Sequence, residues 1–298
     1  MSCLFALHLI VLRYRCIKRN SLLYYVTSGL LFISSFANAQ PLSGYILRKT
    51  DSIAIPYSMV GVVGKTIAVH ADEQGHFKID ANAGDSLEVI APGYETLKHP
   101  ASIMPPKIYL EPRKISLQEV SVIANKIKAT TGTAFNKTNF TFSSHLGVEF
   151  ALKLKLESRR PKQLQKIIIR AKQTSSANLI RLHLYNVNED GLPGEVLLPE
   201  TILLNDYHIR RGKLEIDLLP LNLYCADEYL FVGLEWVGTD NTQQGMQIGF
   251  THDKSNEMVC FTRKNNRNDE WPGIWVPFSL NTHEFKHSVP QISIEYSY

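Results

Sequence analysis

The stretch Asp72-Glu-Gln-Gly75-His-Phe77-Lys-Ile79, followed by Gly84-Asp85-Ser-Leu87-Glu-Val89 and then by Pro92-Gly93-Tyr94, decides the fold. It indicates a tight turn into a short strand, a second turn into another strand, and a Gly-Tyr corner. Phe77 and Ile79 alternate with polar neighbours, so one face of the first strand is expected to point inward. Gly75 ends a turn where a positive φ costs little without a Cβ. This rhythm predicts a small antiparallel β-sandwich.

Residues 41–124 form the first predicted domain. Short alternating runs separated by turn residues fill it, and long amphipathic helical patterns are absent from the sequence. The expected strands are residues 44–48, 54–63, 66–71, 76–80, 86–91, 95–99 and 107–110. Because the connections between these seven strands are short, antiparallel pairing is favoured.

This domain resembles the carboxypeptidase regulatory-like domain, a seven-stranded transthyretin-like (prealbumin-like) sandwich common in exported proteins of Gram-negative bacteria. The tail Leu117-Gln-Glu119-Val120-Ser-Val122 is similar to the stretch that closes this domain before the plug of TonB-dependent receptors. The resemblance implies export, a sandwich fold and a scaffolding or interaction role without catalytic residues. The matching residues are Gly44, Ile46, Pro56, Val60, Gly64, Asp72, Gly75, Phe77, Ile79, Asp85, Leu87, Val89, Gly93 and Tyr94.

A linker is predicted at residues 125–139, which are rich in Lys, Thr and Asn and lack apolar periodicity. The second domain, residues 140–298, opens with apolar residues from Val148 to Leu156 that alternate with charged ones, the pattern of a half-buried antiparallel strand. Seven further strands are expected, at residues 164–171, 179–185, 213–218, 229–237, 246–251, 258–262 and 291–296. Eight or more strands at this spacing predict a second antiparallel β-sandwich of jelly-roll type.

Residues 1–39 have the features of a signal peptide: a basic region, an apolar region, and Ala37-Asn-Ala39 as a cleavage site. They carry four basic and no acidic side chains, so removing them takes the formal charge from +4 to neutral. A neutral remainder gives no support for a nucleic-acid partner. We expect a protein that is periplasmic, associated with the outer membrane or secreted, with no stable transmembrane segment after cleavage.

Two cysteines, Cys225 and Cys260, remain after the predicted cleavage. An even pair in an exported protein allows a disulfide between them. Each lies in or beside a strand-like segment, so two separate buried thiols are an equally good interpretation.

His283-Glu284-Phe-Lys-His287 satisfies the H-E-x-x-H pattern of zinc proteases. That pattern works on a helix, which places both histidines on one face with the glutamate beside the zinc-bound water. Pro277 and Pro290 bracket the segment and a strand is expected from residue 291, so the sequence favours a solvated loop and no metal or cofactor.

Trp271 and Trp275 are the best binding candidates, because equal parity on a strand would place both indoles on one side. Such a pair stacks on sugar rings, with Asn268 and Asp269 placed to bind hydroxyl groups. The alternative is that the tryptophans fill a core.

The sequence therefore predicts a non-enzymatic, exported protein of the cell envelope that acts as a scaffold or binds a glycan or an envelope protein. Two alternatives remain open at this point. One is a zinc-dependent hydrolase that uses His283, Glu284 and His287, and the other is an accessory component of a TonB-dependent uptake system.

Overall fold

Strands account for nearly all of the regular structure in the computed structural model of this protein, which confirms the all-β fold class. The described helical elements are three single 3₁₀ turns: η1 (Ala101–Ile103), η2 (Asp206–His208) and η3 (Leu219–Leu221). None of the helices within these residues is long and apolar enough to span a membrane. The predicted signal peptide lies outside the described residues, which are 41–113, 127–144, 146–157, 160–173, 179–237, 246–253, 258–264, 273–278 and 287–298.

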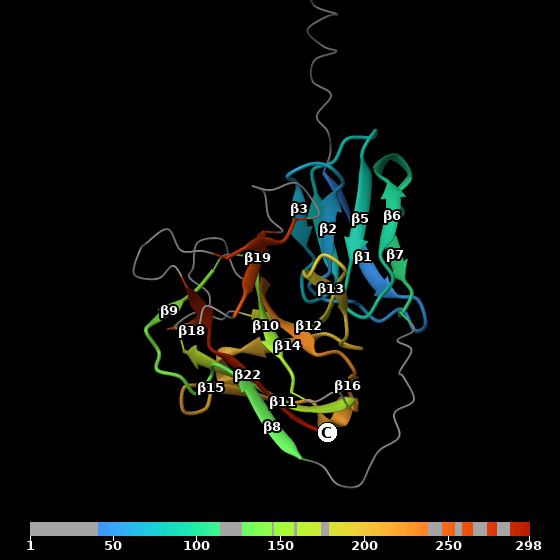
Figure 1. Ribbon diagram of the computed structural model, residues 1–298. Coiled ribbons are helices and arrows are strands. Elements are labelled where there is room, and N and C mark those ends of the chain that lie inside the picture. Colours follow the sequence, from blue (N-terminus) through green and yellow to red (C-terminus); the bar gives the residue numbers. More distant parts are fainter. Residues whose placement is uncertain are drawn as a thin grey trace, which may run out of the picture. The chain divides into compact units, whose positions relative to one another are not determined.

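Seven strands form the N-terminal sandwich, drawn in blue to teal in Figure 1. One sheet has the order β4-β1-β7 and the other β3-β2-β5-β6. The strands are β1 (Leu42–Arg48), β2 (Met59–Val62), β3 (Ala68–His70), β4 (His76–Ile79), β5 (Ser86–Ile90), β6 (Leu97–Pro100) and β7 (Lys107–Leu110).

The expected alternation holds in this sandwich. Phe77 and Ile79 are both 1% exposed and belong to its hydrophobic core. The expectation of purely antiparallel pairing is wrong for one pair, because β1 and β7 run parallel, with Tyr45 opposite Lys107. A parallel pair needs a long crossover connection. Here the five intervening strands supply it.

The C-terminal sandwich has a seven-stranded sheet in the order β13-β12-β17-β10-β19-β20, with β14 also paired to β12. The eight-stranded sheet has the order β21-β18-β11-β22-β8, with β15, β16 and β9 paired off this path. The strands are β8 (Lys128–Gly132), β9 (Phe140–Phe142), β10 (Val148–Lys155), β11 (Lys162–Lys172), β12 (Leu179–Val187), β13 (Pro193–Val196), β14 (Ile202–Asn205), β15 (Lys213–Asp217), β16 (Tyr224–Cys225), β17 (Tyr229–Val237), β18 (Gln247–His252), β19 (Cys260–Lys264), β20 (Val276–Pro277), β21 (Ser288–Pro290) and β22 (Ile292–Ser297).

The chain passes repeatedly between these two sheets: β10 lies in the seven-stranded sheet, β11 in the eight-stranded sheet, and β12 in the seven-stranded sheet again. One large core fills the space between them, with the indole of Trp236 fully buried. Pro41–Tyr298 form one compact unit with this core and the N-terminal core as separate clusters. The predicted sandwich architecture is therefore confirmed.

The segment predicted as a linker contributes to the C-terminal sandwich. β8 pairs along its whole length with β22, from Lys128 opposite Ser297 to Gly132 opposite Ser293. The buried hydroxyl of Thr133 then donates to the carbonyl oxygen of Pro290 at 2.8 Å. A run of Lys and Thr lacks apolar periodicity, but Thr has a high strand propensity. The linker prediction is wrong for these residues.

Cys225 and Cys260 are free thiols, so the disulfide interpretation is wrong and the interpretation as two separate buried thiols is correct. Cys225 lies on β16 in the eight-stranded sheet and Cys260 on β19 in the seven-stranded sheet. Burial raises the pKa of both thiols, which keeps them protonated and unreactive.

Candidate functional site

Charged side chains gather on the face of the seven-stranded sheet that points away from the large core. Along β12, the apolar residues Ile180, Leu182 and Leu184 face that core, so Arg181, His183 and Tyr185 face the opposite side. All three are nearly inaccessible to solvent. The same alternation brings Glu149 of β10, Glu235 of β17 and Arg263 of β19 to this face. We call these six residues the junction cluster.

Gly233 makes the room for this cluster. On β17 it lies opposite His183 of β12 and Ala151 of β10. A Cβ at this position would lie 2.6 Å from Oε1 of Glu149, 2.9 Å from Cε2 of Tyr185 and 3.1 Å from Cβ of His183. A glycine inside a strand commonly marks such a close approach.

Glu235 is the centre of one half of the cluster and is 1% exposed. Its Oε2 lies 2.9 Å from Nε2 of His183 and 3.2 Å from Nη1 of Arg181, and its Oε1 lies 3.2 Å from Nε2 of His70. Burial alone would raise the pKa of Glu235, but the charge of Arg181 and the hydrogen bonds from both histidines hold it well below the usual range. Glu235 is therefore ionised, and both of its carboxylate oxygens have hydrogen-bond partners.

Glu149 is the centre of the other half and is fully buried. Tyr185 donates its hydroxyl to Oε1 at 2.7 Å, and Nε of Arg263 donates to Oε2 at 2.8 Å. Burial, together with the charge of Glu149, raises the pKa of Tyr185 well above its usual range. Burial also disfavours the charge of Arg263, but Glu149 outweighs this and raises the pKa of the guanidinium. Tyr185 is thus a neutral donor and Arg263 a fixed cation.

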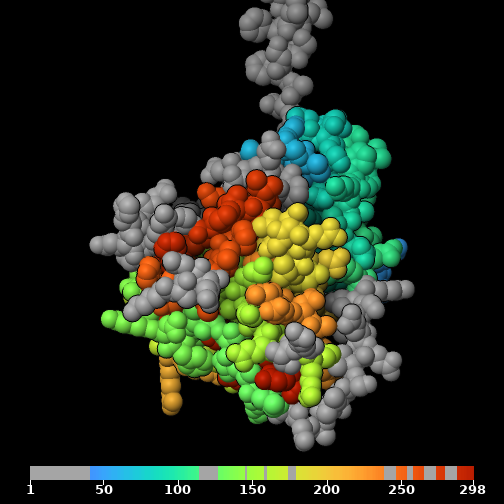
Figure 2. All heavy atoms as spheres, viewed as in Figure 1, coloured from blue at the N-terminus to red at the C-terminus, as the bar shows by residue number. Residues whose placement is uncertain are grey.

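The N-terminal sandwich closes the cluster on its outer side. His70 reaches Glu235 from β3, and Nη2 of Arg181 donates to the carbonyl oxygen of Tyr57. Further along, Nη2 of Arg113 donates to the carbonyl oxygen of Val196. In Figure 2 the yellow surface around β13 borders the teal surface of the N-terminal sandwich at this place. Five of the six residues are buried, whereas the Arg263 side chain is 24% exposed, and the N-terminal sandwich covers the half of the cluster around Glu235.

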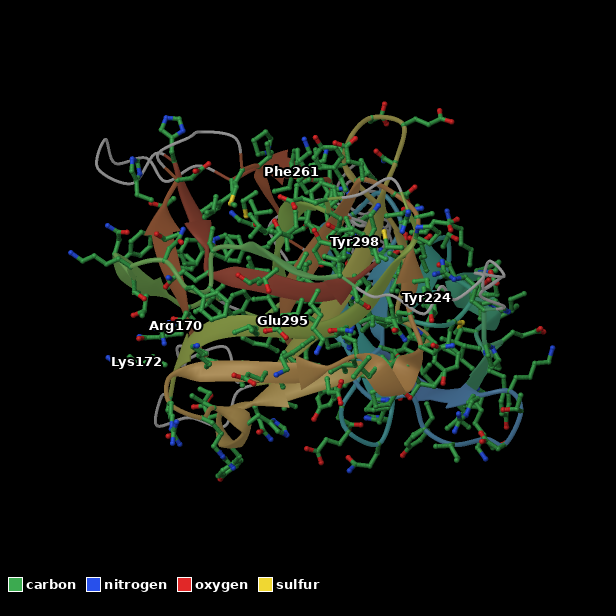
Figure 3. The ribbon with its side chains drawn as sticks, turned by 60° about the horizontal axis from the view of Figure 1, so that its bottom comes forward. Arg170, Lys172, Tyr224, Phe261, Glu295 and Tyr298 are labelled. Atoms are coloured by element: carbon green, nitrogen blue, oxygen red, sulfur yellow. The ribbon has the colours of Figure 1, made fainter. Side chains whose placement is uncertain are left out.

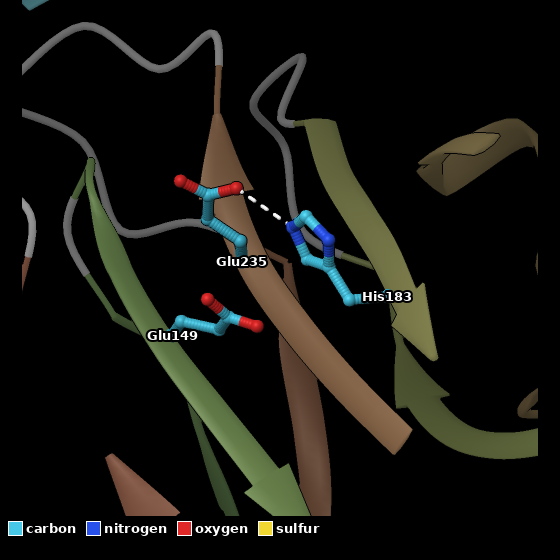
Figure 4. A group of neighbouring side chains, drawn as sticks. All are labelled: Glu149, His183 and Glu235. Atoms are coloured by element: carbon cyan, nitrogen blue, oxygen red, sulfur yellow. Dashed lines mark hydrogen bonds and ion pairs between the residues drawn. The ribbon is translucent and has the colours of Figure 1, made fainter. Parts of the chain in front are cut away.

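Glu149, His183 and Glu235 form a set with the chemistry of a metal site, since one ligand atom from each lies within 4.8 Å of the others. Figure 4 shows the three side chains projecting from neighbouring strands, with the His183–Glu235 contact dashed. However, Arg181 and Arg263 already balance the two carboxylates, and the carboxylate oxygens already accept hydrogen bonds. A metal ion would have to displace these partners, so we interpret the cluster as paired ions.

Two buried nitrogen atoms in the cluster have no hydrogen-bond partner within the described part of the chain, Nε of Arg181 and Nδ1 of His183. Each belongs to a side chain that is otherwise anchored to Glu235. Both carboxylates of the described cluster accept hydrogen bonds from these or other side chains, so neither is free to act as a general base.

Trp275, one of the predicted binding residues, lies beside the junction cluster and is partly buried. The guanidinium carbon of Arg263 lies 4.5 Å from the centre of its ring, and the ring of Tyr185 meets it edge-on at 5.9 Å. One indole face is therefore covered by a cation. Trp271, Asn268 and Asp269 lie outside the described residues, so the predicted pairing of two indoles is not described.

His283 and Glu284 of the H-E-x-x-H segment also lie outside the described residues. His287 is described and exposed, and it directly precedes β21. Its ring centre lies 6.3 Å from that of His252.

Similarity to known proteins is low. No protein-family model matches the chain, and no curated protein matches it in sequence. A variant of the clostridial cysteine protease Cwp84 after propeptide cleavage is 8% identical over 87% of this chain and 70% of that chain, with a TM-score of 0.39. The cysteine protease and lectin-like domains of Cwp84, a surface layer associated protein of Clostridium difficile, are 9% identical over 87% and 63%, with a TM-score of 0.38. A structure of infectious bursal disease virus, Gt strain, is 10% identical over 87% and 62%, with a TM-score of 0.27. These likenesses carry no argument about activity or ligand.

Proposed function

We propose that this protein is an exported, non-catalytic scaffold or binding protein of the bacterial cell envelope. The sequence features that support this are the signal-peptide pattern of residues 1–39 and the resemblance of residues 41–124 to the carboxypeptidase regulatory-like domain. Under this proposal the N-terminal sandwich serves as a docking or spacer module, and the C-terminal sandwich carries the binding surface.

The observation that carries the proposal is the internal pairing of the junction cluster. A hydrolytic site needs a base, nucleophile or metal ligand that is free to meet a substrate. In the junction cluster, Glu149 is paired with Arg263 and Glu235 with Arg181. The N-terminal sandwich covers the half around Glu235 through His70 and Tyr57. Such an arrangement fits a rigid joint between two sandwiches better than an active site.

The binding surface that we propose includes Trp275 and Arg263. A partly exposed indole, braced by a guanidinium, offers a flat apolar surface beside a fixed positive charge. Sugar rings stack on such surfaces, and aromatic and Arg residues are also enriched at protein interfaces. The ligand is therefore a glycan or a protein of the envelope.

A glycan-array screen of the purified protein, its Trp275→Ala variant and a Tyr207→Ala control tests the glycan form of this proposal. Tyr207 is 76% exposed and lies in η2, in the loop between β14 and β15, so its removal is expected to leave binding unchanged. Loss of a glycan signal with Trp275→Ala alone supports the site. A glycan signal that Trp275→Ala does not change, or a wild-type protein that binds no glycan, would exclude glycan binding at Trp275. Capture of an envelope protein by the purified protein would then test the protein-partner form of the proposal.

Two further measurements distinguish this proposal from a zinc-dependent hydrolase and from an accessory component of a TonB-dependent uptake system. Stoichiometric zinc that is lost in His283→Ala, accompanied by hydrolysis of a peptide or ester, would replace the proposal by a zinc hydrolase. Capture of a TonB-dependent receptor from envelope extracts would instead favour the accessory role.

A further inference from the structure

An open pocket of about 440 Å³ lies on the eight-stranded sheet, away from the junction cluster. Its floor is the end of β11, where Arg170 and Lys172 project from the outer face (Figure 3). Thr138 and Thr141, around the start of β9, form one wall. Arg211 and Gly212, from the turn before β15, form the other.

The absence of a side chain at Gly249 leaves space for the side chain of Arg170 beside this pocket. It lies on β18 opposite Thr141 of β9. A Cβ on Gly249 would lie 3.0 Å from Cβ of Arg170 and 2.5 Å from Oε1 of Gln291. Because Gln291 is fully buried and held by Thr138, neither neighbour has room to yield. The pocket is thus part of the packing of the sheet.

The pocket is lined by three cations, Arg170, Lys172 and Arg211, and the described residues that line it include no aspartate or glutamate. A fourth cation, Lys213 on β15, lies directly opposite Arg170 in the strand register. Like charges that face each other across strands destabilise a sheet. By contrast, Lys166 on the same strand is paired with Glu215 at 3.2 Å. None of the ion pairs among the described residues involves Arg170, Lys172 or Arg211, so the excess of positive charge there lies at the pocket.

Arg170 also carries an unused donor. Its Nε is shielded from solvent and has no hydrogen-bond partner among the residues that the structure describes. Leaving a charged donor buried and unpaired is costly. The two threonine hydroxyls already donate to amide oxygens, Thr138 to Gln291 at 2.6 Å and Thr141 to Gln247 at 2.9 Å. The described lining offers hydroxyl and amide acceptors but no carboxylate, so a counter-charge for the cations must come from outside it.

We propose that this pocket binds a small ligand through a phosphate or sulfate group. A doubly charged oxyanion would accept hydrogen bonds from the fork of Arg170 and meet the charges of Lys172 and Arg211 at once. The volume falls within the range of small-molecule sites, so the group is carried by a ligand about the size of a sugar phosphate. This site is separate from Trp275 and does not depend on the function proposed above.

Thermal unfolding and calorimetric titration with inorganic phosphate, sulfate, glucose 6-phosphate and glucose test the proposal at fixed ionic strength. Phosphate is expected to raise the unfolding midpoint of the wild-type protein, since a ligand that binds the folded state stabilises it. Glucose 6-phosphate is expected to bind, whereas glucose, which lacks the anionic group, is expected not to bind. In Arg170→Gln the affinity for phosphate falls roughly tenfold or more, as expected for the loss of a charge-assisted hydrogen bond.

Lys166→Gln is the matched control, because it removes one positive charge from the same strand outside the pocket. It is expected to bind phosphate like the wild type. Lys172→Gln changes an exposed side chain, so it tests the pocket even if Arg170→Gln folds poorly. A wild-type protein that responds to none of the anions, or variants that all weaken binding equally, would overturn the proposal. If phosphate and sulfate bind but glucose 6-phosphate does not, the pocket takes only the free ion, and the proposal of a ligand the size of a sugar phosphate is overturned.

Discussion

Gly233 shows how one residue without a side chain permits a buried ionic group. The Cβ of an alanine there would press on Glu149, whose two oxygens are held by Tyr185 and Arg263 and so cannot retreat. We expect Gly233→Ala to lower the free energy of unfolding by about 1–3 kcal/mol, the usual cost of overpacking. Gly84→Ala is the control, because nothing lies within 4 Å of its Cβ position. Chemical denaturation measures both, and equal stabilities would disprove the close packing around Gly233.

The lowered pKa of Glu235 leads to a prediction of how the free energy of unfolding depends on pH. Its folded-state pKa lies well below its ordinary value of 4.5, so the ionised form contributes stability above about pH 4.5 that is lost as the pH falls through the folded value. Glu235→Gln should flatten this part of the pH profile. At neutral pH it should cost about 3–5 kcal/mol, because Arg181 is left buried without a counter-charge.

Stability measured by denaturation at a series of pH values tests this expectation. The control is Glu215→Gln, which removes an exposed carboxylate paired with Lys166. Its profile should follow that of the wild type. A variant at Glu235 with the wild-type profile would show that this carboxylate is not the acid-sensitive group.

At the scale of elements, the sequence located strands well where apolar and polar residues alternate. β7 (Lys107–Leu110) and β17 (Tyr229–Val237) have the predicted limits, and most others differ by a few residues. Seven strands were not predicted, because they are short or polar and gain their order from pairing with longer strands: β8, β9, β13, β14, β16, β20 and β21. Pairing partners far apart in the chain leave no periodic signal within a strand.

β8 can be tested through Thr133, the buried residue that follows it. Its hydroxyl donates to the carbonyl oxygen of Pro290 and accepts from the backbone N–H of Ile292 at 3.1 Å. Thr133→Val keeps the shape and removes both bonds, which should cost about 1–3 kcal/mol. Thr130→Val on exposed β8 is the control and should be nearly neutral. A neutral Thr133→Val, by chemical denaturation, would restore the interpretation of this segment as a linker.

At the scale of the whole molecule, the class of the fold was predictable and the junction cluster was not. The alternation around Glu149 suggested one solvated face of β10, yet Glu149 is fully buried. The available signal was Arg181, His183 and Tyr185 alternating with Ile180, Leu182 and Leu184, three large polar residues on one strand. That pattern does not tell whether water or a second sandwich covers the polar face. In the structure a second sandwich covers the part of this face around Glu235, because His70 and Tyr57 contact Glu235 and Arg181.

The central claim is that the junction cluster is held together by its own ion pairs and needs no metal. The most direct measurement is the free energy of unfolding of the wild-type protein, as purified and after exhaustive treatment with a metal chelator. The pairing of Glu235 with Arg181 and of Glu149 with Arg263 predicts the same value in both. A chelator-induced loss as large as that caused by Glu235→Gln, restored by adding zinc, would contradict the claim and make the cluster a metal centre.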